Sequence, residues 1–334
     1  MAGIKDIAKK TGLSLATISR VFNDSNLVSN KTKAKVLSVA KELDYQPNLM
    51  AAALRSGKSK IIGVIVPEIN NPFFSAIING IELRASKLGY NIIIAQSHES
   101  SQKENRAIQS LLKLNVEGIL ISVSKQTDYL PILAKLKSNK VPMVFFDRTP
   151  LENDIDQVIL DDYKGAYIAT EHLINQNCKN LLHIVGDLEV SIHQRRKDGF
   201  KDALAKNGIP ISKQRFLSLE MDVNQDTSKI RLLLQSKLPV DGVFVHGDET
   251  CLYVLNILKD LKIKVPKKVK LVGFGNTKFS MLSHPKLSTI DQGCIEMGTY
   301  ASEILIGQLK SKTPLPTQKK ILPPKLIIRE SSAT

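Results

Sequence analysis

The sequence is poor in cysteine and in aromatic residues. Its three cysteines, Cys178, Cys251 and Cys294, lie far apart and form no Cys-X-X-Cys motif. This spacing argues against a disulfide framework and a structural zinc site, so a reducing compartment fits and no metal or cofactor is expected. Tryptophan is absent and aromatic residues make up 5% of the chain, whereas hydrophobic residues reach 43%. The chain can therefore bury a sizeable core, which we expect to be mainly aliphatic.

A long hydrophobic run is also missing near the N-terminus. The longest apolar stretch there, residues 61–67, is far too short to span a bilayer. Lys5, Asp6 and Lys9 interrupt the first residues, which therefore do not read as the apolar segment of a secretory signal. We expect a cytoplasmic protein with no membrane partner.

Negative charge is the scarcer sign in this chain. The sequence has 47 Lys and Arg against 32 Asp and Glu, which gives a formal net charge of +15 at pH 7. Residues 1–60 contain eleven of the basic residues and four of the acidic ones. This surplus indicates an anionic partner, either nucleic acid or an anionic membrane. The length of 334 residues exceeds what one ordinary domain needs, so a separate basic N-terminal domain is expected.

A helix-turn-helix motif is predicted near the N-terminus. Ala8, Gly12 and Ile18 have the required spacing. The small residue lets two helices cross closely, the glycine forms the turn, and the isoleucine buries the second helix against the first. The helices are expected over residues 4–10 and 15–22, with Ser14 as the N-cap of the second.

Two further helices complete the predicted N-terminal region. Ser29 can cap a helix that runs to about Leu43, and Tyr45-Gln46-Pro47 ends it because the residue before a proline avoids helical backbone. Residues 48–54 are rich in alanine, which predicts a short helix within a linker, and the composition of residues 56–59 predicts that the linker continues as a flexible segment.

The second helix carries the predicted DNA contacts. Its exposed side chains are Leu15, Ala16, Thr17, Ser19 and Arg20. Such short side chains suit a helix lying in a major groove, where Arg20 can bind guanine O6 and N7 with two hydrogen bonds. Ser14 and Thr17 can bind phosphate. The alternative is a purely structural helical bundle, which would need neither the basic surface nor these exposed residues.

Beyond residue 60, buried strands alternate with amphipathic helices. Continuous apolar runs of this kind indicate parallel sheets covered on both faces. Strands are expected over 61–66, 91–96, 118–123, 142–147, 158–161, 181–186, 216–219, 242–246 and 270–274.

An internal repeat is visible in the same region. The pair Gly80 and Gly89 returns as Gly199 and Gly208, in both cases 119 residues later. The runs Val116-Glu117-Gly118-Ile119 and Val141-Pro142 return as Val240-Asp241-Gly242-Val243 and Val265-Pro266, 124 residues later. The alternative is that glycine at helix ends and Val-Pro before strands recur in α/β proteins in general. Here, however, the repeated segments occur in the same order in both halves. The sequence therefore predicts two similar doubly wound lobes with a ligand cleft between them.

Several motifs together resemble the LacI/GalR (lactose-repressor) family. The N-terminal runs are Ile4-Lys5-Asp6-Ile7-Ala8, Leu15-Ala16-Thr17-Ile18-Ser19-Arg20-Val21 and Tyr45-Gln46-Pro47-Asn48. The likeness continues through Ile62-Gly63-Val64-Ile65-Val66-Pro67, Asn70-Asn71-Pro72-Phe73-Phe74, Arg196, Gly199-Phe200, Gly247-Asp248 and Val272-Gly273-Phe274. It thus covers essentially the whole chain.

This resemblance implies a fold and a function. The fold is α/β, with an all-α helix-turn-helix head and a two-lobed core like that of periplasmic binding proteins. The function is that of a repressor that binds a pseudo-palindromic operator in double-stranded DNA as a homodimer and responds to a small-molecule effector. Asn48 and Leu54 join the DNA-binding residues, since in the family a leucine of the linker helix enters the minor groove at the operator centre.

The resemblance also places domain boundaries and effector contacts. The head covers residues 1–46, the hinge helix and linker 47–59, and the core 60–334. Lobe one spans about 60–161 and 293–320, and lobe two about 162–292 and 321–334. The implied effector contacts are Asn71, Phe73, Phe74, Ser124, Asp147, Asp161, Arg196 and Asp248.

One position departs from the family pattern. Many members carry an acidic residue where this chain has Gly275. The sequence leaves open whether the effector is a sugar, a sugar derivative or a nucleobase-like ligand. The loss of this acid favours a bulkier or anionic ligand.

Three rival functions have less support in the sequence. An enzyme lacks support because the chain has no Gly-X-Gly-X-X-Gly after a strand, no Gly-X-Ser-X-Gly and no His-Glu-X-X-His. A transport binding protein would carry an export signal in place of residues 1–60. A non-specific architectural DNA protein would need no ligand cleft.

Overall fold

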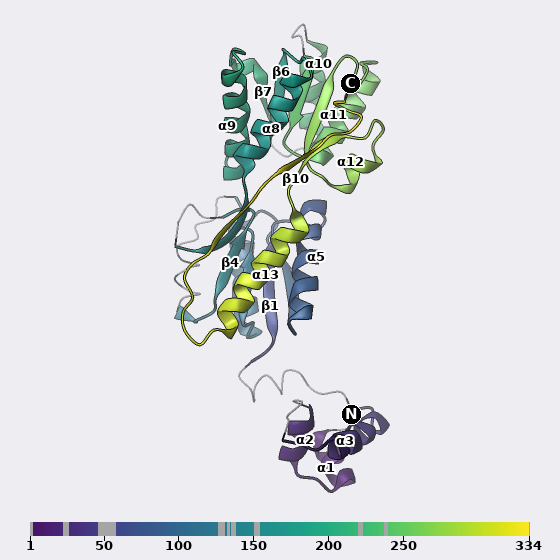
Figure 1. Ribbon diagram of the computed structural model, residues 1–334, viewed down its shortest axis with the longest axis vertical. Coiled ribbons are helices and arrows are strands. Elements are labelled where there is room, and N and C mark those ends of the chain that lie inside the picture. Colours follow the sequence, from purple (N-terminus) through teal and green to yellow (C-terminus); the bar gives the residue numbers. More distant parts are fainter. Residues whose placement is uncertain are drawn as a thin grey trace. The chain divides into compact units, whose positions relative to one another are not determined.

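The chain divides into two compact units, Met1–Ser59 and Lys60–Thr334. A computed structural model (Figure 1) describes residues 3–22, 27–45, 58–125, 131, 134, 138–149, 154–219, 223–236 and 240–333. Asn48 and Leu54 lie outside the described residues. Each unit is built around its own hydrophobic core.

The first unit contains the predicted helix-turn-helix. Its helices are α1 (Ile4–Thr11), α2 (Leu15–Phe22) and α3 (Asn30–Glu42). Gly12 ends α1 with a left-handed backbone, at a φ of 70°, and donates its N–H to the Ala8 carbonyl. Ser14 accepts a hydrogen bond of 3.1 Å from the Thr17 N–H, and Ser29 caps α3 in the same way through Thr32. Ile7, Ile18, Val21, Val36 and Ala40 form the buried core.

The second unit contains two six-stranded sheets. The first has the order β11-β5-β4-β3-β1-β2, and the second β12-β10-β9-β8-β6-β7. The strands of the first are β1 (Ile61–Val66), β2 (Asn91–Gln96), β3 (Gly118–Ile121), β4 (Met143–Phe146), β5 (Asp156–Leu160) and β11 (Lys319–Leu322). Those of the second are β6 (Leu181–Val185), β7 (Phe216–Ser218), β8 (Gly242–Val245), β9 (Lys270–Gly275), β10 (Ser288–Asp291) and β12 (Lys325–Ile327). Strands β10, β11 and β12 were not predicted from the sequence.

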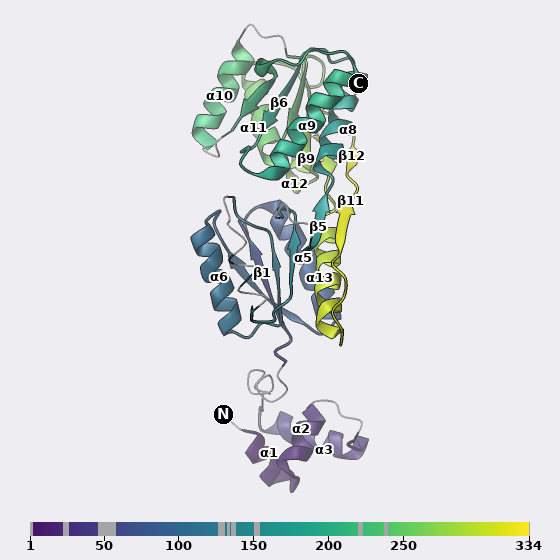
Figure 2. The same cartoon turned by 90° about the vertical axis from the view of Figure 1, so that its left-hand side faces the viewer.

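Helices cover both faces of each sheet, as Figure 2 shows. The first sheet packs between α6 (Ser101–Lys113) on one face and α5 (Pro72–Lys87) with α13 (Cys294–Lys310) on the other. The second packs between α10 (Val223–Gln235) with α11 (Asp248–Asp260) and α8 (Asp162–Asn175) with α9 (Ser191–Lys206). Shorter elements are the 3-10 helix Lys213–Arg215 and α12 (Lys278–Leu282). The α/β doubly wound core is therefore confirmed.

The sequence repeat corresponds to equivalent elements of the two sheets. Gly80 lies in α5 and Gly199 in α9, and each allows its helix to approach a neighbour closely. A Cβ at Gly80 would lie 2.4 Å from the Ile295 carbonyl oxygen of α13, and one at Gly199 would lie 2.2 Å from the Tyr163 carbonyl oxygen of α8. Close helix packing thus explains why glycine occurs at both positions.

Three chain crossings join the sheets, between β5 and α8, between β10 and α13, and between β11 and β12. Figures 1 and 2 show the last crossing as the yellow segment that runs from one sheet to the other. Ile321 and Leu322 pair with Ile159 and Leu160 in the first sheet, so the predicted boundary at residue 321 comes two residues too early. The physical reason is that β11 continues the first sheet in parallel before β12 adds an antiparallel strand to the second.

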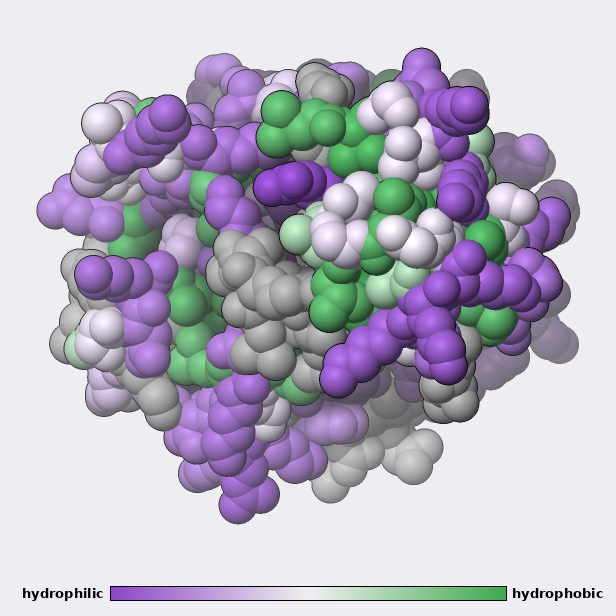
Figure 3. Space-filling view, turned by 90° about the horizontal axis from the view of Figure 1, so that it is seen from below, coloured by the Kyte–Doolittle hydropathy of each residue, from purple (hydrophilic) through white to green (hydrophobic). Residues whose placement is uncertain are grey.

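Hydrophilic side chains predominate on the face seen in Figure 3, where hydrophobic side chains form several separate groups. On the second unit, exposed apolar residues include Leu83 on α5, Ile94 on β2, and Met281 and Leu282 on α12. No helix among the described residues is both long enough and apolar enough to cross a membrane.

Candidate functional site

The exposed face of α2 contains the predicted DNA-reading residues. Leu15, Ala16 and Arg20 are exposed, whereas Thr17 and Ser19 are partly buried. Ile18 is fully buried and fixes this face outward. Ser14 is exposed at the N-terminal end of the helix, where N–H groups favour an anion such as phosphate.

A cavity of about 450 Å³ lies among residues of both sheets of the second unit. Its polar and glycine lining includes Glu68, Asn71, Asp147, Arg148, Gly186, Asp187, His193, Arg196, His246, Gly247, Asp248, Glu249, Gly275 and Gln292. Its apolar lining includes Phe73, Phe74, Ile192, Leu219, Ile230, Phe274 and Phe279. Many of these residues follow the carboxyl ends of parallel strands, which is where open α/β sheets bind ligands.

Arg196, from α9, is buried at the base of the cavity. Its Nε donates to Asp162 Oδ1 at 2.7 Å, and its other nitrogens donate to the His246 carbonyl oxygen at 2.8 Å and to Gln292 Oε1 at 3.3 Å. The Phe274 ring lies 3.6 Å below the guanidinium carbon. Burial raises the pKa of Asp162, while the neighbouring Arg196 opposes that rise. The guanidinium is thus held rigidly by protein groups.

Asp147 follows β4 and has a left-handed backbone, with a φ of 61°. It is 5% exposed, and its Oδ2 accepts one long hydrogen bond of 3.5 Å from Ser122. The same oxygen lies 3.9 Å from Arg148 Nε. Burial raises the pKa of Asp147 to about 7, against opposition from Arg148. This carboxyl group is therefore poorly solvated by the protein itself and faces the cavity.

Asp248, at the start of α11, has its carboxylate fully occupied. Oδ2 accepts the Thr277 N–H at 2.7 Å, and Oδ1 accepts the Thr289 hydroxyl at 2.5 Å. It thereby ties α11 to the ends of β9 and β10. Gly275 nearby has a φ of 140°, a conformation that favours glycine. An acidic residue at this position would be strained on this backbone and would lie beside the Asp248 carboxylate.

Two histidines of the cavity were not predicted. The His193 and His246 rings meet edge to face, with centroids 5.2 Å apart. Burial lowers the pKa of both, to about 4 for His246, so both rings are neutral at pH 7. His193 Nδ1 is buried without a hydrogen-bond partner among the described residues. They follow no motif in the sequence, and only their tertiary positions reveal them.

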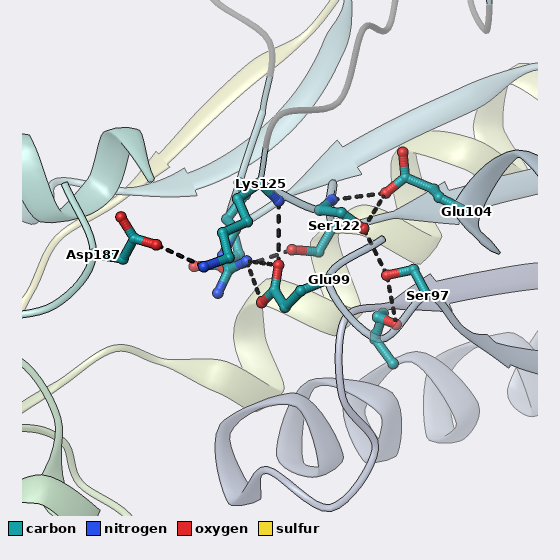
Figure 4. Close-up of polar contacts among 10 residues, drawn as sticks. Ser97, Glu99, Glu104, Ser122, Lys125 and Asp187 are labelled. Carbon is teal, nitrogen blue, oxygen red and sulfur yellow. Dashed lines mark hydrogen bonds and ion pairs between the residues drawn. The ribbon is translucent and has the colours of Figure 1, made fainter. Parts of the chain in front are cut away.

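A polar network borders the cavity at the ends of β2, β3 and β4 (Figure 4). Arg148 binds both carboxylate oxygens of Glu99, at 2.7 and 2.9 Å, and Glu99 accepts the Lys125 N–H. The Lys125 ammonium group reaches Asp187 of the second sheet. Glu104 accepts hydrogen bonds from the N–H and the hydroxyl of Ser124.

The structure places the predicted effector contacts in two groups. Asn71, Phe73, Phe74, Asp147, Arg196 and Asp248 line the cavity. Asn71 also caps α5 by accepting the Phe73 N–H at 2.9 Å, which fixes both phenylalanine rings at the cavity wall. Ser124 and Asp161 are not in its lining. Ser124 is buried against Glu104, and Asp161 accepts the Lys164 N–H as the N-cap of α8, so local hydrogen bonds keep both away from the cavity.

A second cavity of similar volume adjoins the first through Asp147 and Ile192. Its other lining residues include Gln157, Arg195 and Lys319. Within the described part of the chain, no cluster of three or more potential ligand residues could hold a metal ion.

Two family models match the chain. Residues 3–48 match bacterial regulatory proteins of the lacI family, and residues 62–313 match the periplasmic binding protein domain. Among curated proteins, the ribose operon repressor of Halalkalibacterium halodurans is 31% identical over 332 residues, covering 99% of this chain and 97% of the relative. The transcriptional repressor PurR of Vibrio parahaemolyticus is 30% identical, with 99% and 98% covered.

Solved structures of regulators share the fold. A complex of the transcriptional regulator CelR with cellobiose is 26% identical, covers 99% of this chain and 100% of its own, and superposes with a TM-score of 0.74. The Lac repressor dimer bound to operator and an anti-inducer is 24% identical, covers 100% and 99%, and superposes with a TM-score of 0.88. The latter likeness concerns the fold.

Proposed function

The chain belongs to the lacI family of bacterial regulatory proteins and is a DNA-binding transcription regulator, and from this premise we propose a specific division of labour between its two units. The first unit reads operator DNA through α2. The second unit binds a small-molecule effector in its cavity. The protein is a homodimer and acts as a repressor on a pseudo-palindromic operator.

One observation carries this proposal. A helix-turn-helix and a two-sheet core with a ligand-sized cavity occur in one chain. The cavity lies where the ends of two sheets converge, and three chain crossings within the described residues join those sheets. Such crossings permit hinge closure, so a ligand that contacts both sheets favours the closed arrangement.

On the DNA side, Arg20 is the proposed base reader, and Leu15 and Ala16 contact thymine methyl groups. Ser14 and Thr17 bind phosphate, and Ser19 of α2 is a further proposed DNA contact. Asn48 and Leu54, outside the described residues, are assigned to the linker contacts with the minor groove. Because the target is genomic DNA, the protein acts in the cytoplasm.

On the effector side, the proposed contacts are Asn71, Phe73, Phe74, Asp147, Arg196 and Asp248. Aromatic walls with a few convergent polar groups suit a sugar, a sugar derivative or a nucleobase. The relatives named above are regulators, which supports binding of this ligand without turnover.

The test combines DNA selection with ligand screening on the full chain. Selection from random duplexes should yield a two-fold symmetric site, and thermal shifts should identify ligands that also change the affinity for that site. Equal affinity for all duplexes would contradict the DNA-reading assignment. A ligand that binds the cavity but never changes operator affinity would contradict the effector assignment.

A further inference from the structure

A segment rich in lysine joins α11 to β9 in the second sheet. Six of the twelve residues from 259 to 270 are lysine, and one is acidic. Four of these lysines lie in the exposed turn between the two elements, which we call the lysine turn: Lys262, Lys264, Lys267 and Lys268. The Lys268 N–H donates to the Lys264 carbonyl oxygen at 2.8 Å, so the chain closes on itself here and gathers the four charges.

The lysine turn lies at the end of the sheet opposite the effector cavity. Lys270 begins β9 and Gly275 ends it, and Gly275 lines the cavity. Strands β6 to β10 run parallel, so they all begin at the edge where the turn lies. Lys179 is exposed just before β6, and Arg215 lies just before β7. The edge is therefore basic beyond the turn itself, and a partner bound there leaves the cavity free.

The acids beside the turn are engaged elsewhere. Asp260 binds Arg231 at 2.7 Å, and the Asp241 carboxylate accepts the N–H groups of Lys179 and Asn180. No lysine of the turn forms an ion pair within the described residues. Helix capping does not account for these lysines, because α11 ends at Asp260 and another lysine already occupies its last turn. The uncompensated charges favour an anionic partner from outside the chain.

The fold itself does not require these lysines. Val141-Pro142 in the first sheet is the counterpart of Val265-Pro266 in the second, and β4 begins directly after its proline, at Met143. In the second sheet, Lys267-Lys268-Val269 separates the proline from β9. The equivalent strand of the first sheet thus forms without a lysine pair at this place.

The composition of the segment indicates which polyanion it fits. Residues 259–270 contain no aromatic side chain and no exposed large hydrophobic one. Protein interfaces depend on buried apolar or aromatic anchors, membrane-surface segments insert apolar side chains, and single-stranded nucleic acids stack on aromatic rings. Ammonium groups alone suffice for the phosphates of a duplex, whose contacts carry no sequence information.

We propose that the lysine turn binds the phosphate backbone of duplex DNA without regard to sequence, as a contact additional to that of α2. The protein then holds a second DNA segment through its second unit while its first unit occupies the operator. The lysine turn and the effector cavity lie at opposite ends of β9, so both can be occupied at once.

The test uses the full chain with its first unit occupied. A short duplex that contains the selected operator is added to saturation, followed by a labelled duplex of random sequence. Fluorescence anisotropy measures binding of the labelled duplex from about 50 to about 200 mM salt. The variant with all four lysines of the turn changed to glutamine should bind it at least about tenfold more weakly. The slope of log K against log salt should become shallower by about three to four, since each lost phosphate contact removes about 0.9.

A matched variant controls for overall charge. It changes four exposed lysines of the first sheet's layer to glutamine: Lys103, Lys113, Lys310 and Lys312. This control should bind the labelled duplex within about twofold of the wild type, because the same charge is removed away from the turn. Equal losses in the two variants would overturn the proposal, and so would failure of the operator-bound wild type to bind the random duplex.

Two further measurements separate the alternatives. Polyglutamate that binds the operator-bound protein more tightly than a duplex of equal charge would overturn the assignment to DNA in favour of an acidic protein. The turn variant should unfold at the wild-type temperature or above, because mutual repulsion is removed, and a lower temperature would assign the lysines to the fold instead. Operator selection with the turn variant should yield the wild-type site, so this test is independent of the reading of bases by α2.

Discussion

Lys125 Nζ lies 2.6 Å from Asp187 Oδ2 and so joins the loop after β3 in the first sheet to the loop after β6 in the second. The two side chains are 26% and 18% exposed, so water screens the pair only in part. Glu99 accepts the Lys125 N–H and also binds Arg148 (Figure 4). These contacts hold the Lys125 backbone in place at the edge of the first sheet. This ion pair therefore links the two sheets directly beside the cavity.

Removal of this ion pair should ease opening of the effector cavity. Lys125→Met or Asp187→Asn should raise the effector dissociation rate about three- to tenfold, the effect of roughly 1 kcal/mol for a partly exposed pair. Rates are measured by stopped flow at low and high salt. Lys206→Met serves as the control, since its pair with Glu171 lies within one helical layer. Equal salt dependence of the dissociation rate in Lys125→Met and the wild type would refute the role.

Arg20 should read one base pair in each half-site. Arg20→Ala should cost about 1–3 kcal/mol on the selected operator and relax preference at one base pair, because the bidentate contact with guanine is lost. Quantitative selection with both proteins checks this, with Lys9→Ala of the same unit as the control. A uniform loss on all sequences would mean that Arg20 contacts phosphate only.

Asp147 should make stability depend on pH. Its pKa is raised by burial to about 7, from an ordinary value of 3.8, so between these values the folded state holds a proton that the unfolded state releases. Wild-type stability relative to Asp147→Asn should therefore be greatest near pH 4 and fall by up to about 1.4 kcal/mol per pH unit as pH rises to 7. Arg148, Asp162, Arg196 and Cys294 are the ionisable neighbours that modulate this value. Urea unfolding of both proteins at pH 4.5 to 8 tests this, and parallel pH profiles would count against it.

Arg196 should matter for stability as well as for effector binding. Arg196→Ala leaves the Asp162 carboxylate buried without its partner, which costs about 3–5 kcal/mol in comparable sites. The double change with Asp162→Asn should recover a large part of that loss, because the uncompensated charge is removed. Urea unfolding at pH 8 gives the comparison. Additive losses in the double variant would show that the two residues act independently.

The Gly247→Ala variant should show whether the effector contacts the cavity wall at this position. Its backbone is extended, at a φ of −158°, and a Cβ there would meet no atom within 4 Å, so Gly247→Ala should leave the unfolding temperature unchanged. The added methyl group enters the cavity wall and should weaken effector binding more than tenfold. Gly275→Ala is the contrasting variant. At a φ of 140°, with Asp248 Oδ2 3.3 Å from the new Cβ, it should lower stability. Unchanged affinity in Gly247→Ala would place the ligand away from this wall.

The sequence by itself determined the local elements and their order. Ala8, Gly12 and Ile18 lie within eleven residues, so helix crossing, turn and burial follow from neighbouring positions alone. Strands β1 to β9 are apolar runs whose character does not depend on their partners, with small errors at their ends. The repeat of Gly80 as Gly199 gave the two-lobed plan, because close helix packing imposes the same residue on both lobes.

Only the tertiary structure decided which polar groups meet. Arg196 and Asp162 are 34 residues apart, and Lys125 and Asp187 are 62 apart, so no local pattern links either pair. Ser124 and Asp161 stand at strand ends as expected, yet local hydrogen bonds turn them from the cavity. Strands β11 and β12 contain four and three residues. Their pairing depends on the path of the chain as it passes from the first sheet to the second. Side-chain chemistry at the cavity depends on burial and on partners distant in sequence, and folding alone brings these together.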